Sequence, residues 1–337
     1  MIDSMKPLIL LVIFLSLFFV GCGGPAAANS APAAAADGSP TPEPVKKPDP
    51  DLQKQIASIA ETSQGKVGVY AAVLDEGDGR EVSFNADERF AMQSVVKLPI
   101  AMTILNQIDT GKQQGGADAL DLEKKIVVSR DELVPKYMRS PIRDENPAGT
   151  EMTIRELVRY AVSESDGTAA DVLQRVAGGA KGVQDFIDLI DIKDMKVKYS
   201  HKEFGEKWEY QYENWATPRA AYELLYMLWL ASPEVGRSTR HSKESYQVLQ
   251  KYMTEGPTGA NRLKGLLPPG TPVAHKTGTS GTQNGLTAAT NDVGIITMPN
   301  GKHIAIAVFV GDSKADEKTR EAVIAKTAKA VWDAWSK

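Results

Sequence analysis

Ser94 and Lys97, in the sequence Ser-Val-Val-Lys, are residues whose types and spacing could do chemistry in this 337-residue chain. One helical turn would place the lysine amine beside the serine hydroxyl. A serine hydroxyl becomes nucleophilic when a base takes its proton, and burial can lower the pKa of a lysine so that it acts as this base. An ordinary helix-capping serine explains Ser94 equally well when it is considered alone.

A second match, Ser63 and Lys66, lies in a polar segment, and we interpret it as an exposed turn. The Ser94 pair differs because apolar residues would bury its helix: Val95, Leu98, Ile100, Ala101 and Ile104.

A second motif, Ser165-Asp166-Gly167, lies between two helical patterns. A serine on a loop that faces a cleft could pass a proton to a leaving amine. The alternative is that Ser165 or Asp166 caps the helix that follows.

The third motif, from His275 to Gly281, ends a predicted strand. Lys276 would supply a positive charge for a carboxylate, and Thr277 and Thr279 would offer it hydroxyl groups. Gly278 would let a substrate backbone lie close to the strand. The alternative is a solvated edge strand whose lysine discourages aggregation.

The elements that must position these motifs follow from the spacing of apolar residues. Helical patterns cover 51–63, 94–109, 153–164, 168–176, 182–190, 218–231, 242–254 and 316–335. Strand patterns cover 67–74, 80–84, 273–279, 290–298 and 303–310. Strands and a helix at both ends, with helices between them, predict an α+β fold: an antiparallel sheet flanked by helices, with an all-helical lobe. We expect the α/β lobe at about 51–93 and 256–337 and the helical lobe at about 94–255, with a ligand in the cleft between them.

Composition excludes several classes of function. The chain has 39 basic and 43 acidic residues, a formal net charge of −4, and therefore no basic excess for nucleic acid. A single cysteine excludes an intramolecular disulfide and a cysteine-based zinc site. The four histidines form no metal-binding motif and no glycine-rich phosphate loop precedes a helix, so we expect no metal and no cofactor. We also expect a monomer.

Residues 1–22 have the pattern of an export signal. Leu8–Val20 is a short apolar run, and it ends at Phe19-Val20-Gly21-Cys22, which resembles the lipobox of bacterial lipoproteins. The alternative is a plain hydrophobic signal in which Cys22 is incidental. Residues 23–50 are rich in alanine and proline and predict a disordered tether. We therefore expect an exported, periplasmic or cell-surface lipoprotein, anchored to a bacterial membrane through Cys22.

The three motifs occur in order, with 71 residues from Ser94 to Ser165 and 111 from Ser165 to Lys276. They resemble S-x-x-K, S-D-N and K-T-G of the penicillin-recognising serine enzymes, and the spacing resembles that of class A β-lactamases. The resemblance runs from about Asp51 to the C-terminus. Further segments that match are Ala161-Val162, Thr168–Asp171 and Thr290–Ile296, and Gln211–Trp215 resembles a divergent extended-spectrum branch.

This resemblance implies roles for the motif residues. Ser94 would attack the lactam carbonyl to give an acyl-enzyme, Lys97 would take or relay its proton, and Ser165 would protonate the departing ring nitrogen. Lys276, Thr277 and Thr279 would hold the substrate carboxylate, beside Gly278. The backbone N–H groups of Ser94 and Thr279 would form the oxyanion hole. The sequence departs from S-D-N at Gly167, which has no side chain to contact the substrate.

A larger departure concerns the water that hydrolyses the acyl-enzyme. Counted back from Pro218, the place of the family's glutamate base falls on His201, and that of its water-holding asparagine falls on Gly205. Glu203, Glu206 and His201 are all candidates for the base. Loss of a general base typically costs about 10²–10⁴ in rate.

Three functions therefore compete. We expect a β-lactamase. One alternative is a penicillin-binding D-Ala-D-Ala peptidase or a slowly deacylating acyl-transferase that acts on peptidoglycan. Another is a non-catalytic lipoprotein that binds cell-wall peptides. All three take a β-lactam or a small molecule derived from peptidoglycan.

Overall fold

The computed structural model describes residues 47–114 and 119–337. The predicted export signal, Cys22 and the tether up to residue 46 lie outside the described residues. The last part of the predicted tether, 47–50, belongs to the fold, so the expected boundary was wrong there. Strand β1 (Lys47–Pro48) pairs in parallel with β3 (Arg80–Phe84). Asp49 then caps helix α1 (Pro50–Ala60) by accepting from the Leu52 N–H at 3.0 Å.

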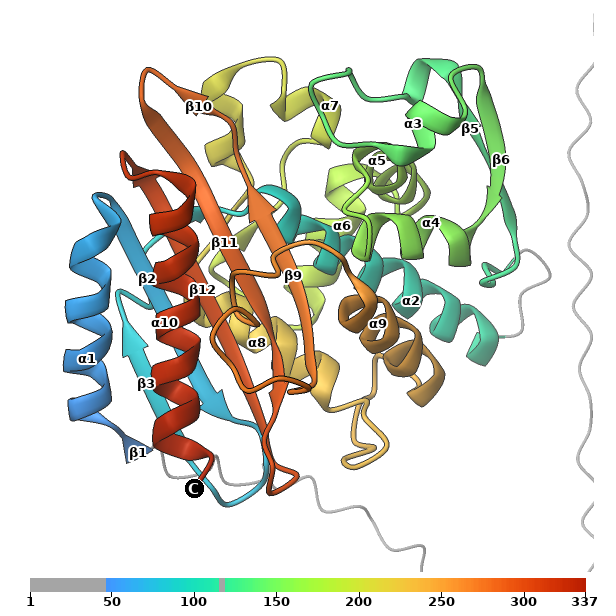
Figure 1. The fold of residues 1–337 in the computed structure, drawn as a ribbon. Helices are drawn as coiled ribbons and strands as arrows, with labels where there is room; N and C mark the ends of the chain where they lie inside the picture. Colours follow the sequence, from blue (N-terminus) through green and yellow to red (C-terminus); the bar gives the residue numbers. More distant parts are fainter. Residues whose placement is uncertain (1–46, 115–118) are drawn as a thin grey trace, which may run out of the picture. The chain divides into compact units, whose positions relative to one another are not determined.

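The main sheet has seven strands in the order β1-β3-β2-β12-β11-β10, with β9 also paired to β11 (Figure 1). Every pairing except β1–β3 is antiparallel. The remaining strands are β2 (Lys66–Val73), β9 (Val273–Thr279), β10 (Thr282–Gln283), β11 (Leu286–Thr297) and β12 (His303–Ser313). These ranges confirm the strands predicted from the sequence and extend the last two by a few residues.

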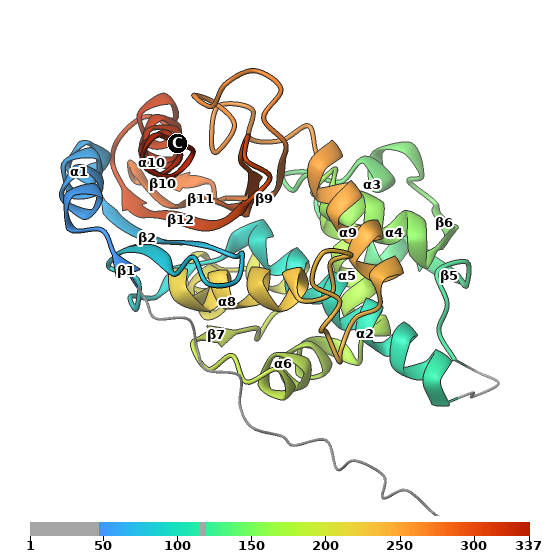
Figure 2. The ribbon, with the colours of Figure 1, turned by 90° about the horizontal axis from the view of Figure 1, so that it is seen from below.

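Both faces of this sheet are covered, which is why β2, β11 and β12 are buried along nearly their whole length. Helices α1 and α10 (Glu317–Trp335) pack together on one face (Figures 1 and 2). Helix α8 (Pro218–Trp229) packs on the other face against β2 and β12. Helix α8 thus lies in the predicted helical lobe by sequence but covers the sheet, because its apolar side chains, including Leu224 and Leu228, are buried.

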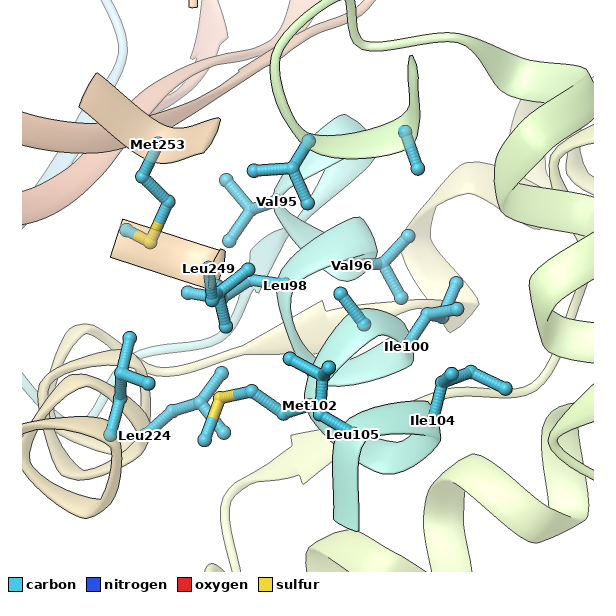
Figure 3. Packing of buried hydrophobic residues seen from close by; sticks show 14 of the residues in the cluster. Val95, Val96, Leu98, Ile100, Met102, Ile104, Leu105, Leu224, Leu249 and Met253 are labelled. Atoms are coloured by element: carbon cyan, nitrogen blue, oxygen red, sulfur yellow. The ribbon is translucent and has the colours of Figure 1, made fainter. Parts of the chain in front are cut away.

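The helical lobe surrounds α2 (Lys97–Gln114). Its helices are α4 (Ile154–Val162), α5 (Gly167–Val176), α6 (Gly179–Leu189) and α9 (Lys243–Glu255). All residues of α2 from Lys97 to Asn106 are buried, as expected of a helix that is enclosed by its neighbours. Figure 3 shows the apolar side chains of this helix packed in one cluster with Leu249 and Met253 of α9.

Two long polar segments, near 127–150 and 196–217, interrupt the helical pattern and contain short elements that the sequence did not predict. The first holds β5 (Lys125–Ser129), η3 (Arg130–Glu132), α3 (Pro141–Glu145) and β6 (Gly149–Thr153). The second holds β7 (Met195–Lys196), α7 (His201–Phe204), η4 (Trp208–Glu213) and β8 (Trp215–Ala216). Strands β4 (Phe90–Ala91), β8 and β7 form a small second sheet beside the segment that carries Ser94.

The Ser63–Lys66 segment differs from its prediction. Lys66 is exposed, but Ser63, at the end of η1 (Glu61–Ser63), is only 1% exposed and donates to the Gly65 carbonyl at 3.0 Å. Within residues 47–114 and 119–337, no helix combines the length and the apolar composition needed to cross a membrane.

Candidate active site

Ser94 lies in a short 3-10 helix, η2 (Gln93–Val96), that leads directly into α2. The turn places Nζ of Lys97 at 2.8 Å from Oγ of Ser94, as the spacing of the pair predicts. Gln93, just before Ser94, has a φ of +49°, which costs a non-glycine residue about 1–3 kcal/mol. Its side chain is held by Gln211, since Nε2 of Gln93 donates to Oε1 of Gln211 at 2.7 Å. The segment before the nucleophile is therefore fixed by the long loop around η4.

Strand β9 supports the same segment from the other side. A Cβ atom on Gly278 would lie 2.4 Å from the Met92 carbonyl oxygen. Asn291, on β11, donates to the carbonyl groups of Ala91 at 2.8 Å and Met92 at 3.2 Å. We predicted that Gly278 makes room for substrate, but the atoms next to its missing side chain are those of Met92, Val95 and Asn291. The motif needs glycine here because the protein's own backbone comes close.

Ser165 joins the first and third motifs. Lys97 donates to its carbonyl oxygen at 2.7 Å, and Lys276 donates to its hydroxyl at 2.9 Å. Ser165 has a φ of +57°, which non-glycine residues rarely adopt, and it is buried where the two lysines meet. The structure thus brings together Ser94, Lys97, Ser165 and Lys276 from three separate parts of the chain.

The two lysines have strongly lowered pKa values because both are almost fully buried. Burial lowers the pKa of Lys97 to about 7; the negative charges of Asp166 and Asp171 oppose this shift and Arg139 adds to it. Burial, with the positive charge of Lys97, lowers the pKa of Lys276 well below its ordinary value. Two buried amines that meet at one serine cannot both hold a proton cheaply. Near neutral pH the site can therefore both accept and donate a proton.

Asp166 caps helix α5, which was one of the interpretations of the Ser165-Asp166-Gly167 motif. It is fully buried, and its carboxylate accepts from the N–H groups of Ala169 at 2.9 Å and Ile142 at 2.8 Å. Because Asp166 caps α5, the Ser165 hydroxyl is left for other contacts. Gly167 lines the cavity, and a Cβ there would lie 3.3 Å from a methyl group of Val134.

The other end of the site is rich in hydroxyl groups and positive charge. Oγ1 of Thr277 lies 2.9 Å from Oγ1 of Thr258. Arg262, only 4% exposed, donates to Oγ1 of Thr279 at 2.8 Å, and its Nε is 3.0 Å from Glu321. The sequence analysis missed Arg262, because it lies in an irregular segment between α9 and β9 that has no periodicity to indicate which side chains turn inward.

The loop predicted to activate water contains three candidate bases, and the structure separates them. His201, at the start of α7, is 5% exposed and lines the cavity. Glu203 is exposed, and its carboxylate closes a capping box by accepting from the Ser200 N–H at 2.8 Å. Glu206 is also exposed. Neither glutamate is among the residues that line the cavity.

Gly205 belongs to this loop and lies beside Met138, which comes from the segment between η3 and α3. A Cβ on Gly205 would lie 2.0 Å from the terminal methyl of Met138, and the hydroxyl of Tyr137 donates to its carbonyl at 3.1 Å. A side chain at position 205 would therefore require Met138 to move. The segment around Met138 takes the space where the family's water-holding side chain was expected.

Two histidines of the main sheet lie outside the cavity. Nδ1 of His275 lies 2.8 Å from a carboxylate oxygen of Asp292. Nδ1 of His303 has no hydrogen-bond partner in the described chain but lies 3.8 Å from the Asp75 carboxylate, and its ring packs against Trp229 at 4.2 Å between centroids. Among residues 47–114 and 119–337, no group of three or more potential ligand side chains could hold a metal ion.

Residues of all three motifs and of the α7 loop line one cavity of about 630 Å³, within the size range of small-molecule sites. Its polar lining residues include Ser94, Lys97, Ser165, His201, Thr277 and Thr279. A nucleophile beside a base of lowered pKa, a relay hydroxyl between two amines and a cationic end define a serine acyl-transfer site.

Comparison with known proteins agrees with this chemistry. The family described as the "Beta-lactamase enzyme family" matches residues 51–335. β-Lactamase VEB-1 of Pseudomonas aeruginosa is 40% identical over 84% of this chain and 90% of its own length. The extended-spectrum β-lactamase PER-1 of the same organism is 38% identical over 84% of this chain and 87% of its own length.

Solved structures give the same result. A β-lactamase from Chitinophaga pinensis DSM 2588 is 40% identical, covers 84% of this chain and 99% of its own, and has a TM-score of 0.77. The TLA-1 extended-spectrum β-lactamase is 38% identical, covers 86% and 99% of the two chains, and has a TM-score of 0.78. The chain belongs to the β-lactamase enzyme family. Within that family it is a class A serine β-lactamase, which confirms both the resemblance and the fold expected from the sequence.

Proposed function

We propose that this protein opens β-lactam rings through an acyl-enzyme on Ser94. The observation that carries the proposal is the buried amine of Lys97, at 2.8 Å from Oγ of Ser94 and with a pKa of about 7. In its neutral form Lys97 takes the hydroxyl proton while Oγ attacks the lactam carbonyl. The carbonyl carbon becomes an ester carbon and its bond to the ring nitrogen breaks.

Ser165 supplies the proton that the departing nitrogen needs. Its hydroxyl accepts a hydrogen bond from Lys276 at 2.9 Å, and Lys97 donates to its carbonyl oxygen. The proton that leaves Ser165 is replaced by the one that Lys97 took from Ser94, since Nζ of Lys97 lies 3.4 Å from Oγ of Ser165, and both amines return to their starting state. This relay protonates the leaving group without drawing on bulk water.

The cationic end of the cavity suits the carboxylate of a penicillin or cephalosporin. Lys276, Thr277 and Thr279 come from β9, and Arg262 lies directly behind the Thr279 hydroxyl. Strand β9 is paired along one edge with β11, which leaves the Thr279 backbone on its other edge for the substrate carbonyl. The backbone N–H groups of Ser94 and Thr279 would together stabilise the developing oxyanion.

A chromogenic cephalosporin tests the proposal and separates it from its alternatives. Continuous turnover that disappears in Ser94→Ala supports a β-lactamase. A stoichiometric burst with a stable adduct on Ser94 would favour the slowly deacylating acyl-transferase or peptidase. Absence of both burst and turnover would favour the non-catalytic binding protein. In the same assay Lys97→Ala tests the proposed base. Lys66→Ala is its matched control, because Lys66 ends the other Ser-x-x-Lys pattern and is exposed.

We also propose that the protein is exported, carries a lipid on Cys22 and is held at a bacterial membrane by the segment that precedes residue 47. The support is the apolar run before Cys22 and the alanine- and proline-rich composition after it. Cys22→Ser should abolish metabolic labelling with a fatty acid and move the protein to the aqueous phase in a detergent partition. Turnover of the purified protein should stay the same, and detergent partitioning unchanged by Cys22→Ser would contradict the anchor.

A further inference from the structure

A buried imidazole without a hydrogen-bond partner lines the cavity that holds the nucleophile. His201 is 5% exposed, and neither of its ring nitrogens has a hydrogen-bond partner among the described residues. Buried polar groups in proteins are nearly always paired with protein or with an ordered water. Both ring nitrogens are themselves buried, so a water molecule from the cavity that this side chain lines would reach one of them after a small movement of the ring or of its neighbours.

Asp171 holds this imidazole in position. Its carboxylate accepts from the backbone N–H of His201 at 2.6 Å and of Lys202 at 2.9 Å. The same carboxylate lies 3.4 Å from Nδ1 of His201. A proton on Nδ1 is stabilised by the nearby carboxylate, which leaves the lone pair of Nε2 free to accept. The ring of Phe204, whose centroid is 4.9 Å away, packs against the imidazole.

Asp171 also ties His201 to the acylation machinery. It lies one turn after Gly167 on α5, the helix that begins directly after Ser165 and Asp166. Helices α5 and α7 are in contact. The histidine is therefore positioned by the same helix that positions the relay serine.

The surroundings of His201 keep the imidazole neutral. Burial lowers its pKa to about 4; the positive charges of Lys97 and Lys276 add to the shift, and Asp171 opposes it. An unperturbed glutamate has a pKa of about 4.3. In basicity His201 thus matches a carboxylate, although it carries no negative charge.

We propose that His201, held by Asp171, is the general base that activates the water which hydrolyses the acyl-enzyme. The inference rests on the proposed acyl-enzyme at Ser94. The water transfers a proton to the imidazole while its oxygen attacks the ester carbonyl. The bond from the carbonyl carbon to Oγ of Ser94 then breaks, and the proton held by the imidazolium ends on Oγ, so the enzyme is regenerated.

The other side chains of this loop cannot take the role in the observed conformation. The Glu203 carboxylate is used in the capping box of α7, and the Glu206 side chain is exposed. Position 205 carries no side chain, and Met138 fills the adjacent space. Among the titratable residues of α7 and its flanks, His201 and Lys207 line the cavity. A hydrogen bond with Tyr210 raises the pKa of Lys207, so its amine stays protonated and cannot act as a base.

A neutral base at this position has a consequence for acylation. The charged groups around Lys97 are Asp166, Asp171, Arg139 and Lys276, and a carboxylate at position 201 would add a further negative charge near the amine. His201→Glu should therefore raise the pKa of Lys97 and move the acidic limb of the acylation rate to higher pH. A residue that only fills space would not produce this shift.

The experiment compares wild type, His201→Gln and His201→Glu in single-turnover reactions with benzylpenicillin and a chromogenic cephalosporin. Intact mass spectrometry follows the adduct on Ser94, and stopped flow gives the acylation and deacylation rates from pH 5 to 9. Glu203→Gln and Glu206→Gln are matched controls, because glutamine preserves the capping box.

We expect His201→Gln to acylate at a rate near that of wild type but to deacylate about 10²–10⁴-fold more slowly, so that the adduct accumulates. His201→Glu should restore deacylation and shift the acylation limb upward, and the two controls should behave as wild type. Formation of the adduct itself reports that each variant is folded. Release of the acyl group by His201→Gln at the wild-type rate would overturn the role of His201 alone. Wild type that neither forms an adduct nor turns over would instead overturn the proposed function, and with it this inference.

Discussion

Nζ of Lys97 lies 2.8 Å from Oγ of Ser94 and 2.7 Å from the carbonyl oxygen of Ser165. This one amine therefore links the nucleophile to the relay residue, which is 71 positions further along the chain. Because Lys97 is only 1% exposed, no water shell stabilises its charged form. We therefore expect the burial of this amine to determine the pH at which the Ser94 hydroxyl becomes nucleophilic.

Acylation should depend on pH through Lys97. Its pKa of about 7 means that the amine is protonated and inactive as a base at low pH, and neutral and active at higher pH. The acylation rate should therefore rise about tenfold per pH unit below 7 and level off above it. Stopped-flow measurement between pH 5 and 9 gives this profile. Lys97→Arg keeps a permanent charge and should be inactive at every pH, whereas an acylation rate in wild type that is flat from pH 5 to 8 would exclude Lys97 as the base.

Lys276 should act on both the leaving group and the substrate carboxylate. Lys276→Ala removes the donor to the Ser165 hydroxyl at 2.9 Å, and we expect kcat/KM to fall about 10²-fold or more for a penicillin. A penicillin methyl ester lacks the carboxylate, so its kcat/KM should fall by a smaller factor. Equal losses for the two substrates would show that Lys276 does not bind the carboxylate.

Gly278 should be intolerant of any side chain. In Gly278→Ala the new methyl would lie 2.4 Å from the Met92 carbonyl oxygen, and the resulting shift should lower the free energy of unfolding by about 1–3 kcal/mol and displace Ser94. Urea denaturation and the acylation rate measure the two effects. Gly281→Ala is the matched control for stability, because a methyl group at that position would meet nothing within 4 Å beyond its chain neighbours. Similar stability of the two variants would contradict the close approach at Gly278.

Asp171 should act as a positioning residue. Asp171→Asn removes a negative charge that raises the pKa values of Lys97 and His201, so both should fall. The acidic limb of acylation should move to lower pH, and deacylation should slow because the imidazole is less firmly oriented. The control is Asp185→Asn, on the exposed part of α6, where the carboxylate pairs with Lys181 at 2.7 Å. An unchanged acylation profile in Asp171→Asn would argue against electrostatic coupling between the two sites.

The sequence by itself determined the features that depend on local spacing. Ser94 and Lys97 are three residues apart in one helical turn, so their contact follows from helix geometry. Apolar periodicity likewise predicted α2, α8 and α10 and the long strands β9 and β12, since each of these elements has one or more faces that must be buried. The order of the three motifs was sufficient for the family, and hence for the fold.

Only the tertiary structure decided what depends on packing between distant segments. Lys276 reaches Ser165 across 111 residues of sequence, and Arg262 reaches Thr279 from an irregular loop. Whether His201 or Glu203 faces the cavity depends on the rotation of a four-residue helix, and Glu206 lies beyond its end. Asp171, which lies 30 residues earlier in the sequence and on another helix, holds the start of that helix by accepting from the His201 N–H. Such contacts follow from the packing of elements whose relative positions no local pattern encodes, and for this reason the sequence could not choose among the three candidate bases.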